Sequence, residues 1–185
     1  MNPDFIEIYD NMLTHEECEE IIEYIDSNEK IRGNFNGQYQ PRIKDSWEIP
    51  GQRLDEPINT NKFLERALRQ SVEKYWTTHP QIKMISSWGP DLGYNLQKYE
   101  PRQGYFSVHC ENGGQKSGIH RMLVWMVYLN TVTDGGGTYF ENYDRTTDAV
   151  EGRVVLWPPY WTHFHNGVVS NTQTKYIATG WFESQ

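Results

Sequence analysis

The second half of this chain restricts its fold most, because short β-type runs alternate there with turn signals. From about residue 82 onward, runs rich in aromatic and β-branched residues are separated by clusters of Gly, Pro, Asn and Asp. The predicted strands are 82–88, 94–99, 105–110, 121–129, 153–157, 161–165 and 176–183. The turn clusters between them lie at 89–91, 101–104, 112–114 and 134–137. Many short strands with such turns are typical of a β-sandwich or jelly roll.

The first 80 residues have a helical pattern instead. Thr14 and Glu17 have the spacing of a capping box, in which the threonine caps a helix and the glutamate reaches back to its amide. An apolar stripe at helical spacing follows, and it comprises Cys18, Ile21, Ile22 and Ile25. Because Cys18 belongs to this stripe, we expect a small buried hydrophobe rather than a reactive thiol. A second helix is predicted over 61–76.

We therefore predict an α+β, mainly β fold: a jelly roll with N-terminal helices packed on one sheet. With 185 residues and no internal repeat, the chain is expected to form a single domain, 1–185. Within it, residues 1–80 would provide helical support and residues 81–185 the jelly-roll core. Segment 28–59 lacks clear periodicity, and either a functional lid or a plain irregular excursion explains it.

Charge and cysteine content exclude several classes of protein. The chain has 25 acidic and 17 basic side chains, and this net charge of −8 argues against binding to nucleic acid or an anionic membrane. No apolar stretch approaches the roughly 20 residues that span a bilayer, and the first residues do not form a signal peptide. The two cysteines, Cys18 and Cys110, do not make a disulfide framework, so we expect a cytoplasmic protein.

Candidate metal ligands occur in two places. His109 and Glu111 are two positions apart in an extended run, so their side chains would point to one face of a strand. Such a pair is common by chance. His163 and His165 form a second pair with the same spacing, and two histidines with one carboxylate make the facial triad that holds non-haem Fe(II) with open coordination positions. Strand alternation cannot separate His163 from His165.

A cation follows these histidines in an apolar segment. Lys175 comes ten residues after His165 and precedes a run of mostly apolar and aromatic residues, 176–182. Burying a cation there is costly without an anion, and a dicarboxylate that chelates iron with one end could meet Lys175 with the other. Taken alone, a strand-edge lysine that prevents aggregation is the more ordinary explanation.

Together these residues resemble the 2-oxoglutarate- and Fe(II)-dependent oxygenases, in particular the prolyl 4-hydroxylase-like branch and its small bacterial and phage members. The resemblance begins weakly at the first helix and becomes strong from Tyr99 onward. Each motif alone is a weak signal, but the set of motifs in this order is specific. The matching positions are Tyr99, Gly104-Tyr105, His109-x-Glu111, Arg121 to Tyr128-Leu129-Asn130, Gly135-Gly136, Gly152, Pro158, His165-Asn166-Gly167, Lys175 and Trp181.

The resemblance implies a double-stranded β-helix in which His109, Glu111 and His165 ligate Fe(II). It also implies that Lys175 and Tyr99 bind the distal carboxylate of 2-oxoglutarate, with Trp181 as a wall of the pocket. The ten-residue step to Lys175 favours His165 over His163, which becomes a neighbour of the site. Hydroxylation would be coupled to decarboxylation of 2-oxoglutarate by O₂, with ascorbate as a possible additional cofactor.

The substrate implied by the resemblance is a prolyl residue in a peptide or protein, and the oligomeric state stays open. If phage-encoded, the protein would act in the host cytoplasm. Two departures from the pattern matter: Glu111 replaces the usual aspartate, and Gly137 replaces an acidic residue. A glutamate that fails to reach iron would leave a non-catalytic jelly-roll binding module as the alternative. A dioxygenase acting on a free amino acid or another small molecule is the other alternative.

Overall fold

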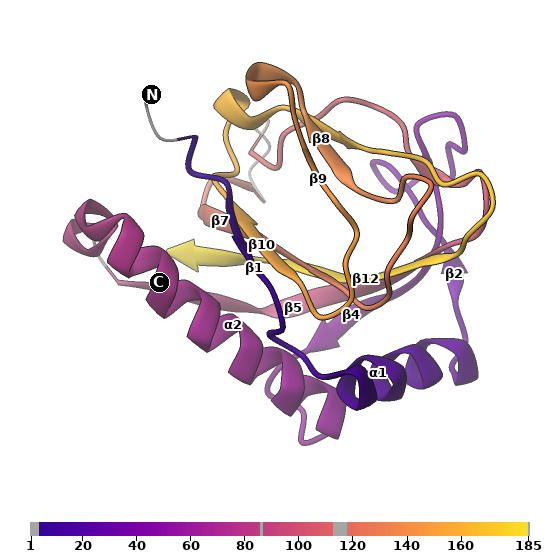
Figure 1. The fold of residues 1–185 in the computed structure, drawn as a ribbon, viewed down its shortest axis with the longest axis horizontal. Helices are drawn as coiled ribbons and strands as arrows, with labels where there is room; N and C mark the ends of the chain where they lie inside the picture. The colour runs from indigo at the N-terminus through magenta and orange to yellow at the C-terminus, as the bar shows by residue number, and fades with distance from the viewer. Residues whose placement is uncertain (1–3, 86, 113–117, 185) are drawn as a thin grey trace.

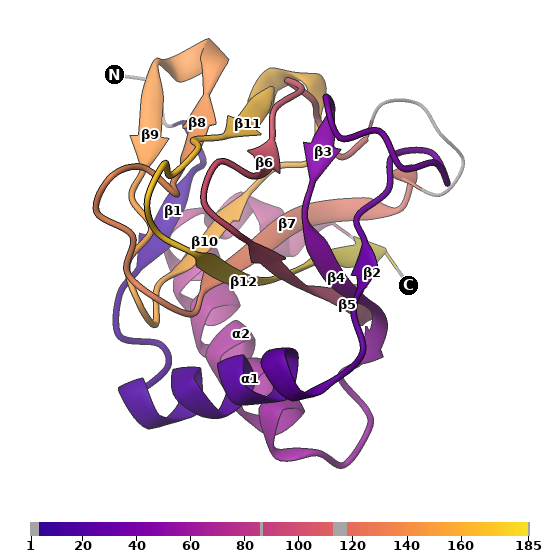
Figure 2. The same ribbon diagram turned by 90° about the vertical axis from the view of Figure 1, so that its right-hand side faces the viewer.

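The computed structural model describes residues 4–85, 87–112 and 118–184 and has three layers (Figures 1 and 2). The central layer is a seven-stranded antiparallel sheet in the order β1-β10-β7-β12-β5-β4-β2. Its strands are β1 (Glu7–Tyr9), β10 (Val154–Trp157), β7 (Arg121–Tyr128), β12 (Lys175–Ser184), β5 (Trp88–Tyr99), β4 (Trp47–Arg53) and β2 (Ile31–Arg32).

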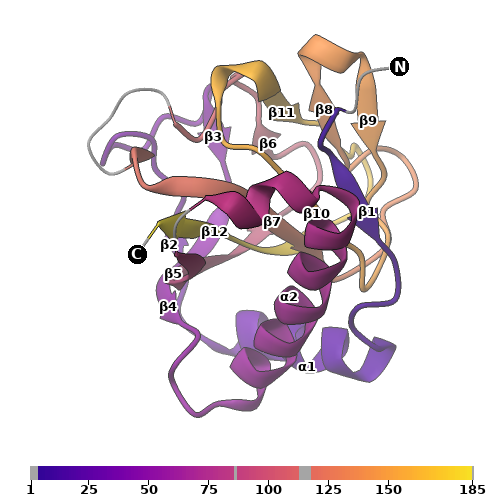
Figure 3. The ribbon, with the colours of Figure 1, turned by 90° about the vertical axis from the view of Figure 1, so that its left-hand side faces the viewer.

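Two smaller sheets lie over one face of this sheet, and two helices cover the other face (Figures 2 and 3). The small sheets are β11-β8-β9 and β3-β6. Their strands are β11 (His165–Gly167), β8 (Thr138–Phe140), β9 (Arg145–Thr147), β3 (Lys44–Asp45) and β6 (Gly104–Tyr105). The helices are α1 (His15–Ser27) and α2 (Asn59–Thr78). The predicted mainly β fold with helices on one face of a sheet is confirmed.

Helix α1 begins where its sequence predicts. The Glu17 amide donates to Thr14 Oγ1 at 3.3 Å, and the Thr14 amide donates to Glu17 Oε2 at 3.0 Å, which completes the capping box. Cys18, Ile21 and Ile25 are fully buried against the sheet. Cys18 is therefore a core residue, as predicted.

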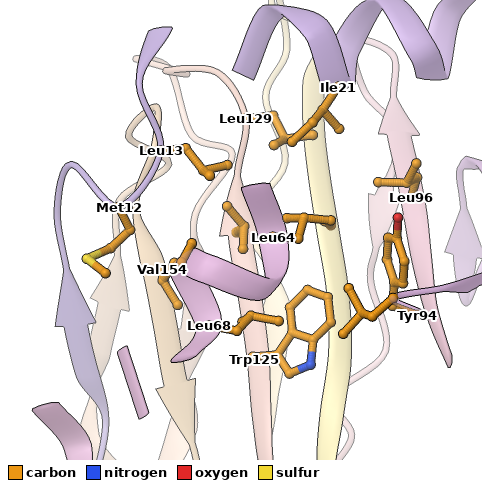
Figure 4. Packing of buried hydrophobic residues seen from close by; sticks show 14 of the residues in the cluster. Met12, Leu13, Ile21, Leu64, Leu68, Tyr94, Leu96, Trp125, Leu129 and Val154 are labelled. Carbon is orange, nitrogen blue, oxygen red and sulfur yellow. The ribbon is translucent and has the colours of Figure 1, made fainter. Parts of the chain in front are cut away.

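Both faces of the large sheet are buried, and alternation along β7 divides its side chains between them. Leu123, Trp125 and Val127 join the core between the sheet and the helices, which Figure 4 shows around Trp125. Val124 and Tyr128 join a second core on the opposite face. Gly180 of β12 lies against Trp125, and a Cβ atom there would be 2.5 Å from the indole. The second core forms part of the interior between the large and small sheets.

The predicted boundary between helical support and jelly roll at residue 80 is wrong. Strands β1, β2 and β4 from the first 80 residues pair within the large sheet, and β3 pairs with β6. Segment 28–59 thus contributes strands to the sheets. Its strand β4 was missed because Pro50 and Gly51 interrupt the pattern, and the structure accommodates them at a register shift between Ile49 and Gln52.

Three predicted strands also differ from the structure. Residues 80–84 form a 3₁₀ helix (Pro80–Met84) instead of a strand, because proline is well placed in a first helical turn. Within 105–110 only Tyr105 belongs to a strand, followed by an isolated bridge at His109. Trp161–His163 is a 3₁₀ turn, and β11 starts only at His165.

The predicted turn at 112–114 lies partly outside the described residues. None of the described helices is long and apolar enough to cross a bilayer.

Candidate metal centre and cosubstrate pocket

The structure brings His109, Glu111 and His165 together between the large and small sheets. One ligand atom from each lies within 4.8 Å of the others. Glu111 Oε1 is 3.3 Å from His109 Nε2 and 3.7 Å from His165 Nε2. Two imidazoles and one carboxylate converging from one side are the donor set expected for a non-haem Fe(II) site, so the residues fit this metal.

The backbone fixes the relative position of the two histidines. His109 and His165 form an isolated antiparallel bridge, with N–H···O distances of 3.0 and 2.9 Å between their main chains. The two imidazole centres are 4.4 Å apart. This bridge replaces the long strand that the sequence predicted around His109, and it is enough to place both rings side by side.

Hydrogen bonds to carbonyl groups fix which nitrogen of each ring faces the cluster. His109 Nδ1 donates to the Ser107 carbonyl and His165 Nδ1 donates to the His163 carbonyl, each at 2.9 Å. Because a carbonyl can only accept, the proton of a neutral ring stays on Nδ1. The Nε2 lone pair is then free to bind a cation.

Aromatic rings pack against both histidines. Tyr105 stacks on His109 with ring centres 3.8 Å apart, and Trp157 meets His165 edge-on at 5.1 Å. Burial lowers the pKa of His165, which favours the neutral, metal-binding form. Burial alone would raise the pKa of Glu111, but hydrogen bonds and positive charge from the His109 and His165 rings, when these are protonated in the absence of metal, hold this pKa well below the usual range.

Two further side chains contact the second carboxylate oxygen of Glu111. Trp181 Nε1 donates to Glu111 Oε2 at 3.1 Å, and Arg121 Nη1 lies 3.3 Å from the same oxygen. The predicted role of Trp181 was that of a pocket wall, and Trp181 does line the cavity. Arg121 was noted only as the start of a strand, because sequence spacing does not show that β7 and β12 bring it beside Glu111.

A cavity of about 210 Å³ joins this cluster to Lys175. It lies between the large and small sheets. Lys175, Ile177, Thr179 and Trp181 line it from alternate positions of β12, as strand geometry requires. Lys175 is 6% exposed and has no carboxylate partner among the described residues. Burial lowers the pKa of Lys175 to about 8. The part of the chain that the structure describes therefore places a buried cation in the cavity without a counter-ion.

Tyr99 lies beside Lys175 at the same end of the cavity. The Lys175 ammonium is 4.6 Å from the centre of the Tyr99 ring. The Tyr99 hydroxyl donates to Gln97 Oε1 at 2.7 Å. The two residues predicted to bind one end of a dicarboxylate are thus together, and Gln97 is an additional polar group that sequence reasoning missed.

Lys44 is a second cation at the cavity that the sequence did not reveal. Its ammonium is 2.5 Å from Glu48 Oε1, and both side chains are buried. Ser46 donates to the same carboxylate oxygen at 2.9 Å. These residues come from the segment predicted as a lid or irregular excursion, and without regular spacing no pattern in the sequence pointed to them.

His163 is directed away from the ligand cluster. Its Nε2 lies 2.7 Å from the Asp4 carbonyl, and its ring is 5.1 Å from that of Tyr143. The parity argument that left His163 and His165 equivalent does not apply, because His163 belongs to a 3₁₀ turn. Its backbone carbonyl nevertheless orients His165.

The close approach of the backbone explains why a glycine, Gly137, occupies the position where an acidic residue was expected. A Cβ atom there would lie 2.1 Å from the Thr147 carbonyl oxygen. Strands β8 and β9 therefore approach too closely at this point for any side chain.

A wider groove of about 860 Å³ opens beside the cluster. It shares Tyr105, His109 and Glu111 with the cavity, so a molecule in the groove would reach the ligand cluster. Its other lining residues are largely aromatic and polar: Asn34, Phe35, Asn36, Cys110, Asn112, Gly118, Arg121, Tyr160, Trp161 and Phe164. Trp161 is 68% exposed, which is unusual for so large an apolar side chain.

Comparisons of sequence point to one family. A model of the 2OG-Fe(II) oxygenase superfamily matches residues 94–183, which contain all the predicted ligand and cosubstrate residues. Prolyl 4-hydroxylase 5 of Arabidopsis thaliana is 30% identical over 142 residues, or 72% of this chain. The match covers 43% of the plant protein, so the chain spans less than half of that relative.

Comparisons of structure agree on the fold. A viral collagen prolyl hydroxylase from Paramecium bursaria Chlorella virus-1, solved with 2OG, has a TM-score of 0.73 at 16% identity over 98% of this chain and 97% of that one. A prolyl hydroxylase from Trichoplax adhaerens, in complex with a hypoxia inducible factor peptide, has a TM-score of 0.77 at 18% identity over 99% and 85%. A Pseudomonas putida prolyl-4-hydroxylase has a TM-score of 0.72 at 13% identity over 97% and 93%.

Proposed function

We propose that the chain is a member of the 2OG-Fe(II) oxygenase superfamily, whose model matches residues 94–183, and that it is an Fe(II)- and 2-oxoglutarate-dependent dioxygenase that hydroxylates prolyl residues in a peptide or protein. The observation that carries the proposal is one cavity with two sites. It has a two-histidine, one-carboxylate cluster at one end and, at the other, the buried Lys175, for which the described residues provide no carboxylate partner. A dicarboxylate that also binds metal is the ligand whose charges match both ends.

In this proposal His109, Glu111 and His165 hold Fe(II), and Lys175 with Tyr99 binds the distal carboxylate of 2-oxoglutarate. When bound, iron and cosubstrate would supply the oxidising chemistry, in which O₂ converts 2-oxoglutarate to succinate and CO₂ and hydroxylates a C–H bond of the substrate. The chain's own residues bind and orient these partners. Tyr105 and Trp157 pack against the histidines, and the Ser107 and His163 carbonyls hold both Nε2 atoms toward the metal.

A peptide substrate is supported by the groove beside the cluster. It is about four times as large as the cavity, at about 860 Å³ against about 210 Å³, and it leads to the same ligand residues. Exposed aromatic side chains on its rim, Tyr160, Trp161 and Phe164, provide flat apolar surfaces against which prolyl rings can pack. The plant relative is named as a prolyl 4-hydroxylase, and the Trichoplax adhaerens neighbour was solved with a peptide.

We also propose that the protein is cytoplasmic. Cys18 and Cys110 are both free thiols, as expected in a reducing compartment. Ascorbate is proposed as an additive that sustains turnover, by analogy with the family.

The test is incubation of the purified protein with Fe(II), 2-oxoglutarate, ascorbate and a library of proline-containing peptides. Succinate release together with one added oxygen atom on a prolyl residue, found by mass spectrometry, is the expected result. His109→Ala should abolish both signals. A parallel incubation replaces the peptides with free amino acids, and if the added oxygen is found only there, the peptide substrate is wrong. If 2-oxoglutarate does not bind to the metal-loaded protein, the chain is a binding module.

A further inference from the structure

Glu111 is longer than an aspartate by one methylene group, and two other side chains contact its carboxylate. Its Oε1 lies 3.3 Å from His109 Nε2 and 3.7 Å from His165 Nε2, whereas its Oε2 contacts Trp181 and Arg121. Trp181 Nε1 donates to Oε2 at 3.1 Å, and Arg121 Nη1 lies 3.3 Å from it. The two carboxylate oxygens thus have separate partners.

Arg121 is itself fixed in three ways. Its Nη1 donates to the Glu111 backbone carbonyl at 2.7 Å, so it holds both the main chain and the side chain of this residue. Its guanidinium carbon lies 3.6 Å from the centre of the Trp181 ring, which places the cation over the indole face. Its Nε is 3.9 Å from Glu183 Oε1, which is within ion-pair range but too far for a hydrogen bond. The Arg121 side chain is only 18% exposed, so these contacts are shielded from solvent.

The stacked side chains of Arg121 and Trp181 therefore act together on the carboxylate of Glu111. A glutamate has one more rotatable bond than an aspartate, so a free Glu111 would sample conformations in which Oε1 misses the cluster. Donors on Oε2 remove this freedom and occupy one oxygen, which leaves Oε1 to face a metal. Outer hydrogen bonds of this kind are known to orient carboxylate ligands and raise metal affinity.

We propose that Arg121 and Trp181 form a clamp that fixes the Glu111 carboxylate and presents its Oε1 as a single ligand oxygen. Both are positioning residues for the metal centre. This assignment rests on the proposed Fe(II) site, and it goes beyond it by naming the residues that fix the orientation of its carboxylate ligand.

The test measures binding of Mn(II) alone by isothermal titration calorimetry, without 2-oxoglutarate or substrate. Trp181→Phe keeps an aromatic ring under Arg121 but removes the N–H donor. Arg121→Lys keeps the charge but loses the planar, multi-donor head. We expect each variant to weaken Mn(II) binding at least about tenfold. Trp88→Phe, the same substitution at the far end of β5, is the matched control and should leave Mn(II) affinity unchanged. Thermal unfolding of each variant checks that the fold is retained.

The same measurement in a Glu111→Asp variant distinguishes an effect of Trp181 on the position of Glu111 from a general packing effect. In Glu111→Asp the shorter carboxylate should no longer reach the indole N–H. Adding Trp181→Phe should therefore cost less than about twofold in Mn(II) affinity there. An equal loss in both backgrounds, or no loss in the Glu111 background, overturns the clamp while leaving the proposed function intact. If the unsubstituted protein fails to bind Mn(II), the metal centre and the clamp both fail.

Discussion

Lys175 lies directly opposite Tyr99 in the pairing of β12 with β5, and its ammonium is 4.6 Å from the centre of the Tyr99 ring. The ring face attracts the cation, but it does not replace a full counter-ion. Because Lys175 is buried without a carboxylate among the described residues, burial lowers its pKa to about 8. The charge of this one side chain should therefore control how an anionic cosubstrate binds.

Affinity for 2-oxoglutarate should fall as the pH rises above about 8. Below this pH Lys175 is protonated and can pair with a carboxylate. Above it the free protein has a neutral amine, and each pH unit should weaken binding by up to about tenfold, until the pKa of the bound form is reached. Calorimetric titration of 2-oxoglutarate into protein saturated with Mn(II), from about pH 7 to pH 10, would measure this.

Lys175→Arg is the control for that pH profile. An arginine keeps its charge throughout this range, so its affinity for 2-oxoglutarate should stay nearly constant above pH 8, even if it is weaker overall. Parallel losses in the lysine and arginine proteins would show that another group causes the pH dependence.

Replacing Lys175 with methionine should stabilise the metal-free protein while it abolishes 2-oxoglutarate binding. The folded-state pKa of Lys175 is about 8, below the ordinary value of 10.5, so carrying the charge in the folded state is unfavourable at neutral pH. We expect a gain on the order of 2–3 kcal/mol in the free energy of unfolding at pH 7. Urea unfolding would measure it. The unsubstituted protein should also become more stable between pH 8 and 10.5, and Lys175→Met should not; a destabilised variant would contradict the assignment.

The elements predicted well from sequence are those with strong local signals. Helix α1 follows from a capping box and one apolar stripe, and β7 and β12 follow from continuous apolar runs that are buried on both faces. Their boundaries in the structure lie close to the predicted ones because no long-range contact opposes the local preference.

Strand β4 and the Lys44–Glu48 pair could not be predicted in this way. Pro50 and Gly51 argue locally against a strand, and pairing with β5 overrides them through a register shift. Lys44 and Glu48 have ordinary polar surroundings in the sequence. They become buried only because β3 and β4 are brought to the sheets by pairing with distant strands.

At the site, the candidate ligand and cosubstrate residues could be predicted from sequence, but the side chains that orient them could not. The spacing of His109, Glu111, His165 and Lys175 was informative because regular alternation in β12 and a single bridge between the histidines preserve it in space. The role of Arg121 depends on how two strands and a loop meet. His163 was ambiguous because a 3₁₀ turn, which breaks strand alternation, was not evident from the pattern.

His109 and His163 should respond very differently to substitution by alanine. His109→Ala removes one of the three converging donors, so Mn(II) affinity should fall at least about a hundredfold. His163→Ala removes a ring directed to the Asp4 carbonyl but keeps the backbone carbonyl that orients His165, so affinity should change by less than about threefold. Calorimetry on both variants decides the matter: a large loss in His163→Ala would mean that His163, rather than His165, is the second histidine ligand.

Gly180→Ala should destabilise the fold, because a Cβ atom would lie 2.5–3.0 Å from three atoms of the Trp125 indole. Overpacking of this kind costs about 1–3 kcal/mol. Gly93→Ala in β5 is the matched control, because its Cβ would meet only the Asp91 carboxylate at 3.6 Å or more. Denaturant unfolding of both variants should give a clearly lower midpoint only for Gly180→Ala. Equal effects would mean that the loss of glycine flexibility, not the contact with Trp125, sets the cost.

Trp161 should contribute to binding a peptide but not to binding the cosubstrate. Its side chain is 68% exposed on the rim of the groove, and it does not line the cavity that contains Lys175. Loss of an aromatic surface that packs on a prolyl ring should raise the KM for a proline-containing peptide about tenfold in Trp161→Ala. Succinate formation without peptide should be unchanged. Met84→Ala serves as the control, because Met84 is 87% exposed and does not line the groove. An unchanged KM in Trp161→Ala would mean that the substrate approaches the metal cluster by another route.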